Sequence, residues 1–170
     1  MINIEKYNDY KYMSLVGDIL YNKEFIKTKS IKHHGLSRYE HSIRVSYYAY
    51  IITKKFHLDY KKAARAGLLH DFFLESGNDA TIKEKIKVLI NHPKIAVENA
   101  KKYFDISLIE EDIIRTHMFP VTLRVPRYLE SWFVVLIDDV CAIYEALSIK
   151  GKRIKYALNL LILMLMNYLG

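Results

Sequence analysis

The chain has 170 residues, of which 51% are hydrophobic and 26% charged, the composition of one ordinary globular domain with a core of its own. Its formal net charge of +7 favours the binding of anions but does not identify a particular ligand, and a lysine-rich solubilising surface would give the same net charge. A single cysteine excludes an internal disulfide and suits the reducing cytosol, and the first residues lack the pattern of a signal peptide. The most apolar stretch, residues 157–169, is too short to cross a bilayer. We therefore expect a cytoplasmic protein with no membrane-spanning segment.

Helical periodicity dominates the chain, and signals that begin a helix recur along it. Capping boxes, in which a Ser or Thr and a Glu three residues later satisfy free backbone donors, begin at Ser37, Thr81 and Ser107. Asp59 has the side chain of an N-cap, and Pro93 stands where the first turn of a helix would tolerate proline. In chain order, the predicted helices cover about 7–21, 38–56, 60–74, 82–91, 94–103, 108–117, 130–147 and 152–168.

Few residues interrupt this helical pattern. A proline-containing loop is predicted from Met118 to Tyr128, and Gly151 breaks the chain before the last helix. The sequence contains no internal repeat, no linker and no convincing hairpin signal. We therefore predict an all-α fold, with one domain of six to eight helices over residues 1–170.

Two carboxylates stand in strongly apolar helices, where a charge is costly unless it is paired or bound to a metal. Asp71 follows His70 after a run of Ala and Leu residues. Asp138 interrupts a second apolar run and has Asp139 directly beside it. Because two adjacent carboxylates repel each other, a bound cation is the simplest partner for at least one of them.

Small residues precede this His-Asp pair. Ala63, Ala66 and Gly67 come seven, four and three positions before His70, so they share its face of the helix. Side chains of that size allow a neighbouring helix to approach closely, and we expect one to pack there.

Three further histidines fall on other predicted helices. His41 lies one turn into the helix that begins after Ser37, His92 directly precedes Pro93, and His117 ends its helix. A lone histidine on a helix is more often a packed core or surface residue than a ligand. Together, imidazole and carboxylate groups suit iron, zinc, manganese or cobalt. Each ligating imidazole must be neutral, and its second nitrogen needs an acceptor.

The ordered set resembles the HD superfamily of metal-dependent phosphohydrolases, whose hallmark is a His, then a His-Asp pair, then a distant Asp, all on helices. The matching residues here are His41, His70, Asp71 and Asp138. In the branch with two metals, two more histidines lie between the pair and the last Asp, and His92 and His117 fall in those places. The resemblance extends over residues 34–145 or so.

The resemblance implies that one metal is held by His41, His70, Asp71 and Asp138, and a second by Asp71, His92 and His117. It further implies hydrolysis of a phosphate ester or anhydride, with a nucleotide as the expected substrate, through a metal-bound hydroxide. The expected cofactor is one or two divalent transition-metal ions, iron first, with manganese, zinc or cobalt as alternatives. Relatives that cleave diadenosine tetraphosphate share the ligand order, so a dinucleoside polyphosphate is the first substrate expected, ahead of nucleoside monophosphates and guanosine polyphosphates.

Two positions depart from the pattern of many relatives. Leu74 stands where they have a Lys, three residues after the His-Asp pair, and Asp139 stands where Lys or Tyr often follows the last Asp. Glu75 is the nearest substitute for the missing Lys and is a candidate catalytic residue beside Asp71, because it could orient water. The alternative is an ordinary exposed Glu at the end of a helix.

Four residues are candidates for contact with a phosphorylated substrate. Arg44 lies one turn after His41 on the same face, where it could hold a phosphate or form a salt bridge. His34 just precedes this helix and is expected at the mouth of the pocket. Arg124 and Arg127 could form a basic lid over it, or belong to an ordinary solvated loop.

Two alternatives to an enzyme stay open. The first is an HD-like module that binds nucleotide or RNA through its basic surface without catalysis, although such a module would not need all six ligands. The second is a structural protein whose apolar last helix mediates assembly, and a homodimer of this kind is compatible with an enzyme. The sequence has no zinc-finger spacing and no RNA-recognition signature, so we expect no nucleic-acid partner.

Overall fold

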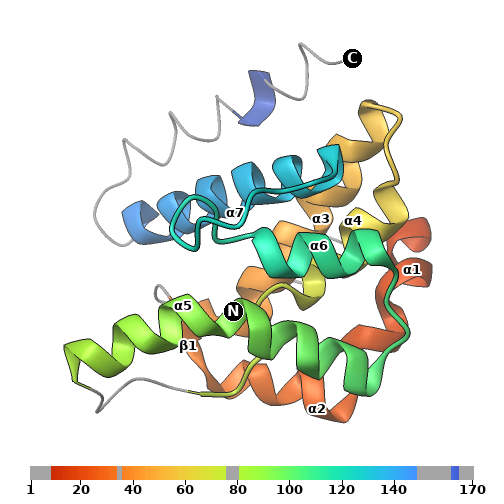
Figure 1. The fold of residues 1–170 in the computed structure, drawn as a ribbon. Coiled ribbons are helices and arrows are strands. Elements are labelled where there is room, and N and C mark those ends of the chain that lie inside the picture. Colours follow the sequence, from red (N-terminus) through yellow and green to blue (C-terminus); the bar gives the residue numbers. More distant parts are fainter. Residues whose placement is uncertain (1–8, 34–35, 76–80, 149–161, 165–170) are drawn as a thin grey trace.

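The computed structural model describes residues 9–33, 36–75, 81–148 and 162–164 (Figure 1). The all-α prediction is confirmed, and the β structure in the described ranges consists of two antiparallel two-residue strands. The elements are α1 (Tyr10–Leu20), α2 (Lys23–Ile26), the 3-10 helix η2 (Lys27–Ser30), β1 (Lys32–His33), β2 (Leu36–Ser37), α3 (Arg38–Lys55), α4 (Tyr60–Leu69), α5 (Ile82–Tyr103), α6 (Leu108–Thr116) and α7 (Leu129–Ser148).

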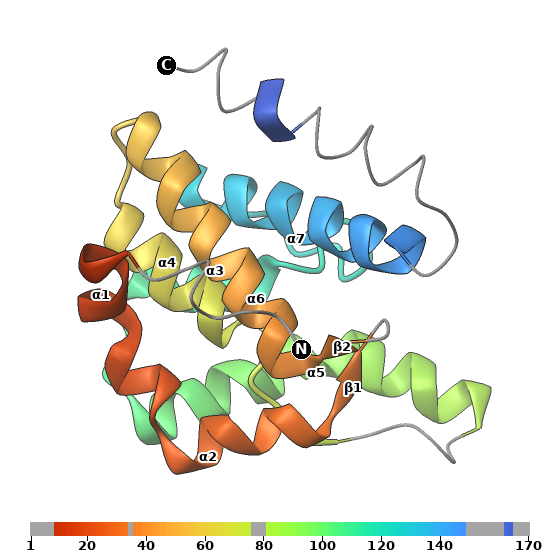
Figure 2. The ribbon, with the colours of Figure 1, turned by 180° about the vertical axis from the view of Figure 1, so that it is seen from behind.

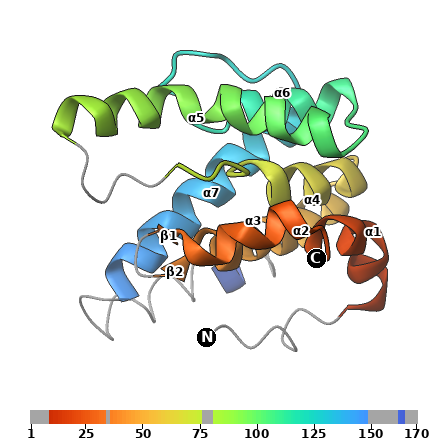
Figure 3. The same ribbon diagram turned by 90° about the horizontal axis from the view of Figure 1, so that it is seen from below.

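Helix α4 lies at the centre of the molecule, in contact with α1, α3, α5, α6 and α7. Helices α5 and α6 lie along one side, α1 to α3 along the other, and α4 and α7 between them (Figure 3). Seen from behind, α3 runs diagonally across the molecule beside α4 and α7 (Figure 2). The residues that follow α4 therefore lie within reach of most of the other helices.

The close packing of α4 depends on its small residues, as the sequence predicts. Ala63, Ala64 and Ala66 are fully buried. A Cβ atom added at Gly67 would lie 3.1 Å from the Cα atom of Ser46 in α3, tighter than nearly all real contacts of that kind. The Ser46 hydroxyl donates a hydrogen bond of 2.6 Å to the Ala64 carbonyl, which joins the two helices directly.

The helix starts predicted at the three capping boxes and at Asp59 are confirmed. Ser37, Thr81 and Ser107 each form a reciprocal capping box with the Glu three residues later. The Asp59 carboxylate accepts a hydrogen bond from the Lys62 amide at the start of α4. Each of these caps depends only on residues within one turn of the helix start, so the sequence alone is enough to predict them.

Proline does not begin a helix at Pro93, contrary to the sequence prediction. The two helices predicted over 82–91 and 94–103 are one continuous helix, α5, with Pro93 inside it. An interior proline costs about 3 kcal/mol or more, because it removes a hydrogen bond and crowds the preceding turn. Burial of Ala96, Val97 and Ala100 against the core offsets that cost and holds the second half of α5 in line with the first.

Other boundaries also differ from the prediction. Helix α4 ends at Leu69 rather than near residue 74, and it is followed by a turn and an irregular segment in which Phe72 and Phe73 are buried. Helices α2 and η2 and the two short strands are additions, since elements of two to four residues carry no readable periodicity. The predicted last helix, 152–168, lies outside the described residues except for 162–164, which are helical. Among the described helices, none has the length and apolar character of a membrane span.

Candidate metal centre

The six predicted metal ligands converge at the centre of the bundle. They come from α3, from the residue pair after α4, from the middle of α5, from the residue after α6, and from α7; in order they are His41, His70, Asp71, His92, His117 and Asp138. None exposes more than 8% of its surface. Ligand atoms of three overlapping groups lie within 4.8 Å of one another, namely His41, His70 and Asp71; His70, His117 and Asp138; and Asp71, His92 and His117.

Backbone carbonyls orient two of the imidazoles. His70 Nδ1 is 2.8 Å from the Gly67 carbonyl oxygen, and His117 Nδ1 is 2.9 Å from the Ile114 carbonyl oxygen. A carbonyl oxygen only accepts, so each Nδ1 carries the proton and each Nε2 keeps a lone pair when the ring is neutral. The same contact, from a residue just past a helix to the carbonyl three positions earlier, recurs after α4 and after α6.

The Nε2 atom of His70 is the clearest sign that this cluster fits a metal. It is buried and has no hydrogen-bond partner, although Asp138 Oδ1 lies 3.5 Å away and Asp71 Oδ2 lies 3.8 Å away. A buried polar atom of this kind normally has a partner, and its absence calls for an explanation. A divalent cation between imidazole nitrogens and carboxylate oxygens would satisfy all of them, so the residues present fit such an ion.

A carboxylate that the sequence analysis did not single out orients His41. His41 Nδ1 is 2.9 Å from Glu145 Oε2, and His41 Nε2 is 2.9 Å from Asp138 Oδ1. Burial disfavours protonation of His41, but hydrogen bonds to Asp138 and Glu145 outweigh it and raise its pKa to about 10. Metal binding through Nε2 therefore has to displace a proton, so metal affinity should fall as the pH falls.

The two oxygens of Asp71 face different histidines. Oδ1 lies 3.3 Å from His92 Nε2 and 3.8 Å from His117 Nε2. Oδ2 lies 3.8 Å from His70 Nε2 and 4.0 Å from Arg38 Nε. Asp71 therefore lies between His70 on one side and His92 and His117 on the other.

The histidines on the two sides of Asp71 differ in the direction in which their pKa is shifted. Burial, followed by the charges of His70 and His92, lowers the pKa of His117 to about 3, and burial also lowers the pKa of His92. Burial likewise works against protonation of His70, but Asp138 and Asp71 reverse the effect and raise its pKa. The imidazoles of His92 and His117, whose Nε2 atoms are 2.8 Å apart, are thus kept neutral, as metal ligation requires.

Arg38 is a second residue beside the cluster that the sequence analysis did not single out. It is 5% exposed, its guanidinium lies 3.5 Å from the centre of the Phe73 ring, and its Nη1 donates to the Phe73 carbonyl oxygen at 2.5 Å. Phe73 in turn stacks on His92, with ring centres 4.8 Å apart. The signal was available, because Arg38 precedes His41 by three residues and so shares its helix face.

Glu75 and Asp139, the two acidic residues that the sequence places near the metal ligands, are exposed to solvent. Glu75 is exposed and lies in the irregular segment after α4 rather than at a helix end. Asp139 lies on the exposed side of α7, and partial burial and the neighbouring Asp138 raise its pKa. Only Asp138 is buried with the cluster, and the repulsion expected between the two adjacent carboxylates contributes to the raised pKa of Asp139. The catalytic role of Glu75 stays a prediction.

The four candidates for substrate contact lie in different places. Arg44 Nη1 donates to Glu145 Oε1 at 2.7 Å, so the salt bridge considered for this residue is present. His34 lies outside the described residues. Arg124 and Arg127 are exposed and line a groove whose lining includes none of the six ligands. Substrate contact by any of the four stays a prediction.

Replacement of Glu145 by Gln should lower metal affinity about tenfold or more, since carboxylates that orient a ligating histidine are typically worth 10–100-fold. The amide keeps the shape of the side chain but removes the charge that holds the proton on His41 Nδ1. Competition of the protein with a chromophoric chelator for Mn²⁺ or Zn²⁺ measures the effect. Glu98→Gln, at an exposed glutamate, is the control. Equal affinity in both variants would show that Glu145 does not orient a ligand.

The comparisons with known proteins agree with this geometry. A sequence profile of the HD domain matches residues 38–155, which include helices α3 to α7 and all six of the converging residues. Searches among curated proteins and among solved structures gave no significant match. On the match over more than two thirds of its length, this chain belongs to the HD-domain family.

Proposed function

We propose that this protein is a metal-dependent phosphohydrolase that acts on a small phosphorylated substrate, a nucleotide in the first place. One observation carries the proposal: the buried imidazole nitrogens and carboxylate oxygens of six residues converge, and among them His70 Nε2 lacks a hydrogen-bond partner. Burying so many ionisable groups is costly unless they bind a cation. Membership of the HD-domain family, whose members are generally metal-dependent hydrolases, supports the same chemistry.

Two ions are proposed for this centre. The residues that would hold the first are His41, His70, Asp71 and Asp138, and those that would hold the second are Asp71, His92 and His117. The separation of the Asp71 contacts supports this division, because Oδ1 faces His92 and Oδ2 faces His70. A divalent metal, when bound, would make water nucleophilic at neutral pH and offset the charge on the phosphoryl oxygens.

The protein itself would position these groups and limit access of water. Glu145 fixes the ring of His41, while the backbone carbonyls of Gly67 and Ile114 fix those of His70 and His117. Arg38 would act through Asp71, because its buried guanidinium lies 4.0 Å from Oδ2 and would hold that carboxylate in position. We regard Arg38 as a positioning residue.

The substrate class rests on charge and on the order of the ligands. The net charge of +7 favours an anion. Relatives with the same ordered set cleave dinucleoside polyphosphates, which we propose as the first substrate to test. Nucleoside monophosphates and guanosine polyphosphates come next.

A hydrolysis screen of the metal-loaded protein tests the proposal. It should use iron, manganese, cobalt, zinc and magnesium in turn, with dinucleoside polyphosphates, nucleoside mono- and triphosphates, guanosine polyphosphates, cyclic dinucleotides and an aryl phosphate. We expect turnover of at least one nucleotide, and elemental analysis should find up to two transition-metal ions per chain. If no metal supports turnover of any phosphate ester, the hydrolase proposal fails in favour of a binding module without catalysis.

A further inference from the structure

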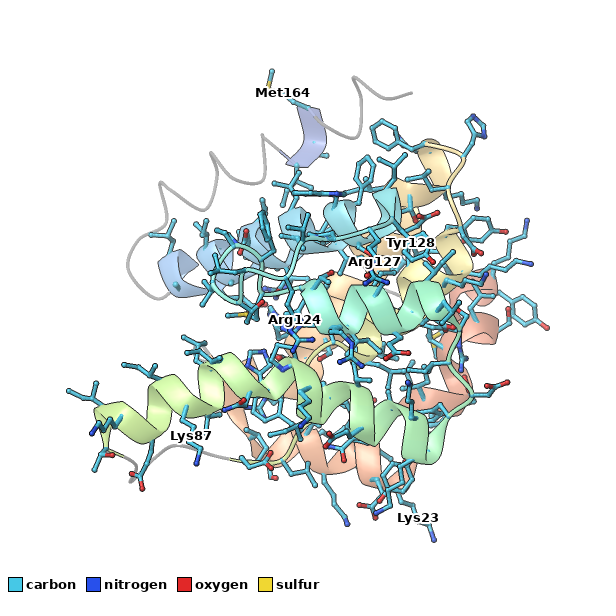
Figure 4. All side chains as sticks on the ribbon, viewed as in Figure 1. Lys23, Lys87, Arg124, Arg127, Tyr128 and Met164 are labelled. Atoms are coloured by element: carbon cyan, nitrogen blue, oxygen red, sulfur yellow. The ribbon has the colours of Figure 1, made fainter. Side chains whose placement is uncertain are left out.

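A groove lies between α6 and the segment 124–128, which returns along that helix towards α7. It encloses a cavity of about 380 Å³, lined by Arg115 of α6 and by Arg124, Arg127 and Tyr128 of the segment, among others. Figure 4 shows Arg124, Arg127 and Tyr128 along α6, with Lys23 and Lys87 on other parts of the molecule. We call this feature the arginine groove.

The acidic residues of the arginine groove already have partners. Glu111 forms ion pairs with Arg115 and, at 2.8 Å, with Lys101. Asp112 Oδ2 accepts hydrogen bonds from the Arg127 backbone amide at 3.0 Å and from the Ser131 hydroxyl at 2.7 Å. The charge of Glu111 is therefore neutralised by two cations, whereas Asp112 uses Oδ2 to hold the segment against α6.

Two guanidinium groups of the arginine groove, by contrast, have no carboxylate partner. Within the part of the chain that the structure describes, neither Arg124 nor Arg127 forms a side-chain ion pair. Both are exposed, and they line the same cavity as the Arg115 guanidinium. Arg115 is paired with Glu111, but the guanidinium groups of Arg124 and Arg127 repel each other, and an anion between them would remove that repulsion.

Contacts within the protein hold the wall of the arginine groove in place. The hydrogen bonds from Arg127 and Ser131 to Asp112 tie the segment to α6 at its far end. At its near end, Leu123 holds the chain in the left-handed region with φ 51°, a conformation that most side chains avoid. A preformed wall lowers the entropy that a ligand loses on binding.

We propose that the arginine groove binds the phosphate groups of a small phosphorylated molecule, at a site separate from the metal centre. Guanidinium groups bind phosphate oxygens through paired, charge-assisted hydrogen bonds. The cavity falls in the range of small-molecule sites, about 300–1,000 Å³. Tyr128 and Val125 supply an aromatic and an apolar surface for the remainder of the ligand. None of the six metal-centre residues lines the cavity, so binding needs no metal.

Isothermal titration of the chelator-treated, metal-free protein with tripolyphosphate tests this proposal. The double variant Arg124→Ala/Arg127→Ala should bind tripolyphosphate about tenfold or more weakly, because each arginine contributes charged hydrogen bonds. Lys23→Ala/Lys87→Ala is the matched control, since it removes the same charge from two exposed sites elsewhere. Arg124→Gln/Arg127→Gln should behave like the alanine pair while keeping longer side chains. The thermal unfolding temperature of each variant confirms that it is folded.

The variant His70→Ala separates this site from the metal centre. It should bind tripolyphosphate with unchanged affinity, whether or not the protein proves to be a hydrolase. Loss of binding in His70→Ala would place the anion in the metal centre and overturn the proposal. If the affinity for tripolyphosphate falls equally in the arginine and lysine double variants, the effect is one of net charge. If it falls in neither arginine double variant, the arginine groove does not bind tripolyphosphate. Both results contradict the proposal.

Discussion

Replacement of His70 by Ala, or of Asp71 by Asn, is expected to abolish hydrolysis, with kcat/KM lower by about 10³-fold or more. A metal at such a centre contributes several kcal/mol to the transition state, and each 1.36 kcal/mol corresponds to a factor of ten. His70 presents the Nε2 atom that lacks a partner, and Asp71 faces both halves of the ligand set. Steady-state rates on the best substrate of the screen, together with metal content, measure the loss.

These variants should remain folded, because a helical core of this size does not depend on a metal. Asp71→Asn keeps the volume of the side chain beside Arg38, and circular dichroism with thermal unfolding checks the fold. The control is His57→Asn, at an exposed histidine outside the cluster whose φ of 57° asparagine tolerates. Hydrolysis at the wild-type rate in either His70→Ala or Asp71→Asn would end the proposed mechanism.

Replacement of Gly67 by Val should destabilise the protein by about 3 kcal/mol, since overpacking of a tight core typically costs 1–3 kcal/mol and occasionally more. Even the first added carbon would lie 3.1 Å from Ser46 Cα and 3.4 Å from Ser46 N, which are backbone atoms that cannot rotate away. For a chain of this length the melting temperature should fall by roughly 10 °C. Metal affinity should fall as well, because the Gly67 carbonyl orients His70.

The matched substitution is Gly17→Ala, also inside a helix, where an added Cβ meets only the Tyr21 ring at 4.0 Å. Alanine is favoured over glycine in a helix by about 1 kcal/mol, so this variant should be as stable as the parent or more stable. Gly67→Ala, which has the same propensity gain, should be less stable than Gly17→Ala. If Gly67→Ala and Gly17→Ala have the same melting temperature, the approach of α3 and α4 is not as close as the structure indicates.

The sequence by itself determined the helical class, three capping boxes and the order of six candidate ligands. Caps depend on side chains within three residues, so Ser37, Thr81 and Ser107 display them locally. The ligands stood out because a buried carboxylate needs a partner wherever it lies, as Asp71 and Asp138 do. The helix start predicted at Pro93 was wrong, because a local rule for proline cannot anticipate the burial that keeps α5 continuous.

Only the tertiary structure decided which side chains support the ligands and where the loop arginines lie. His41 meets Glu145 across 104 residues, and no pattern shorter than that separation could have paired them. The sequence left open whether Arg124 and Arg127 form a lid or belong to an ordinary solvated loop, and only the tertiary structure shows that they line a groove along α6. Local sequence specifies helices through contacts within one turn, but the position of a side chain relative to a distant helix is fixed by the packing of the whole core.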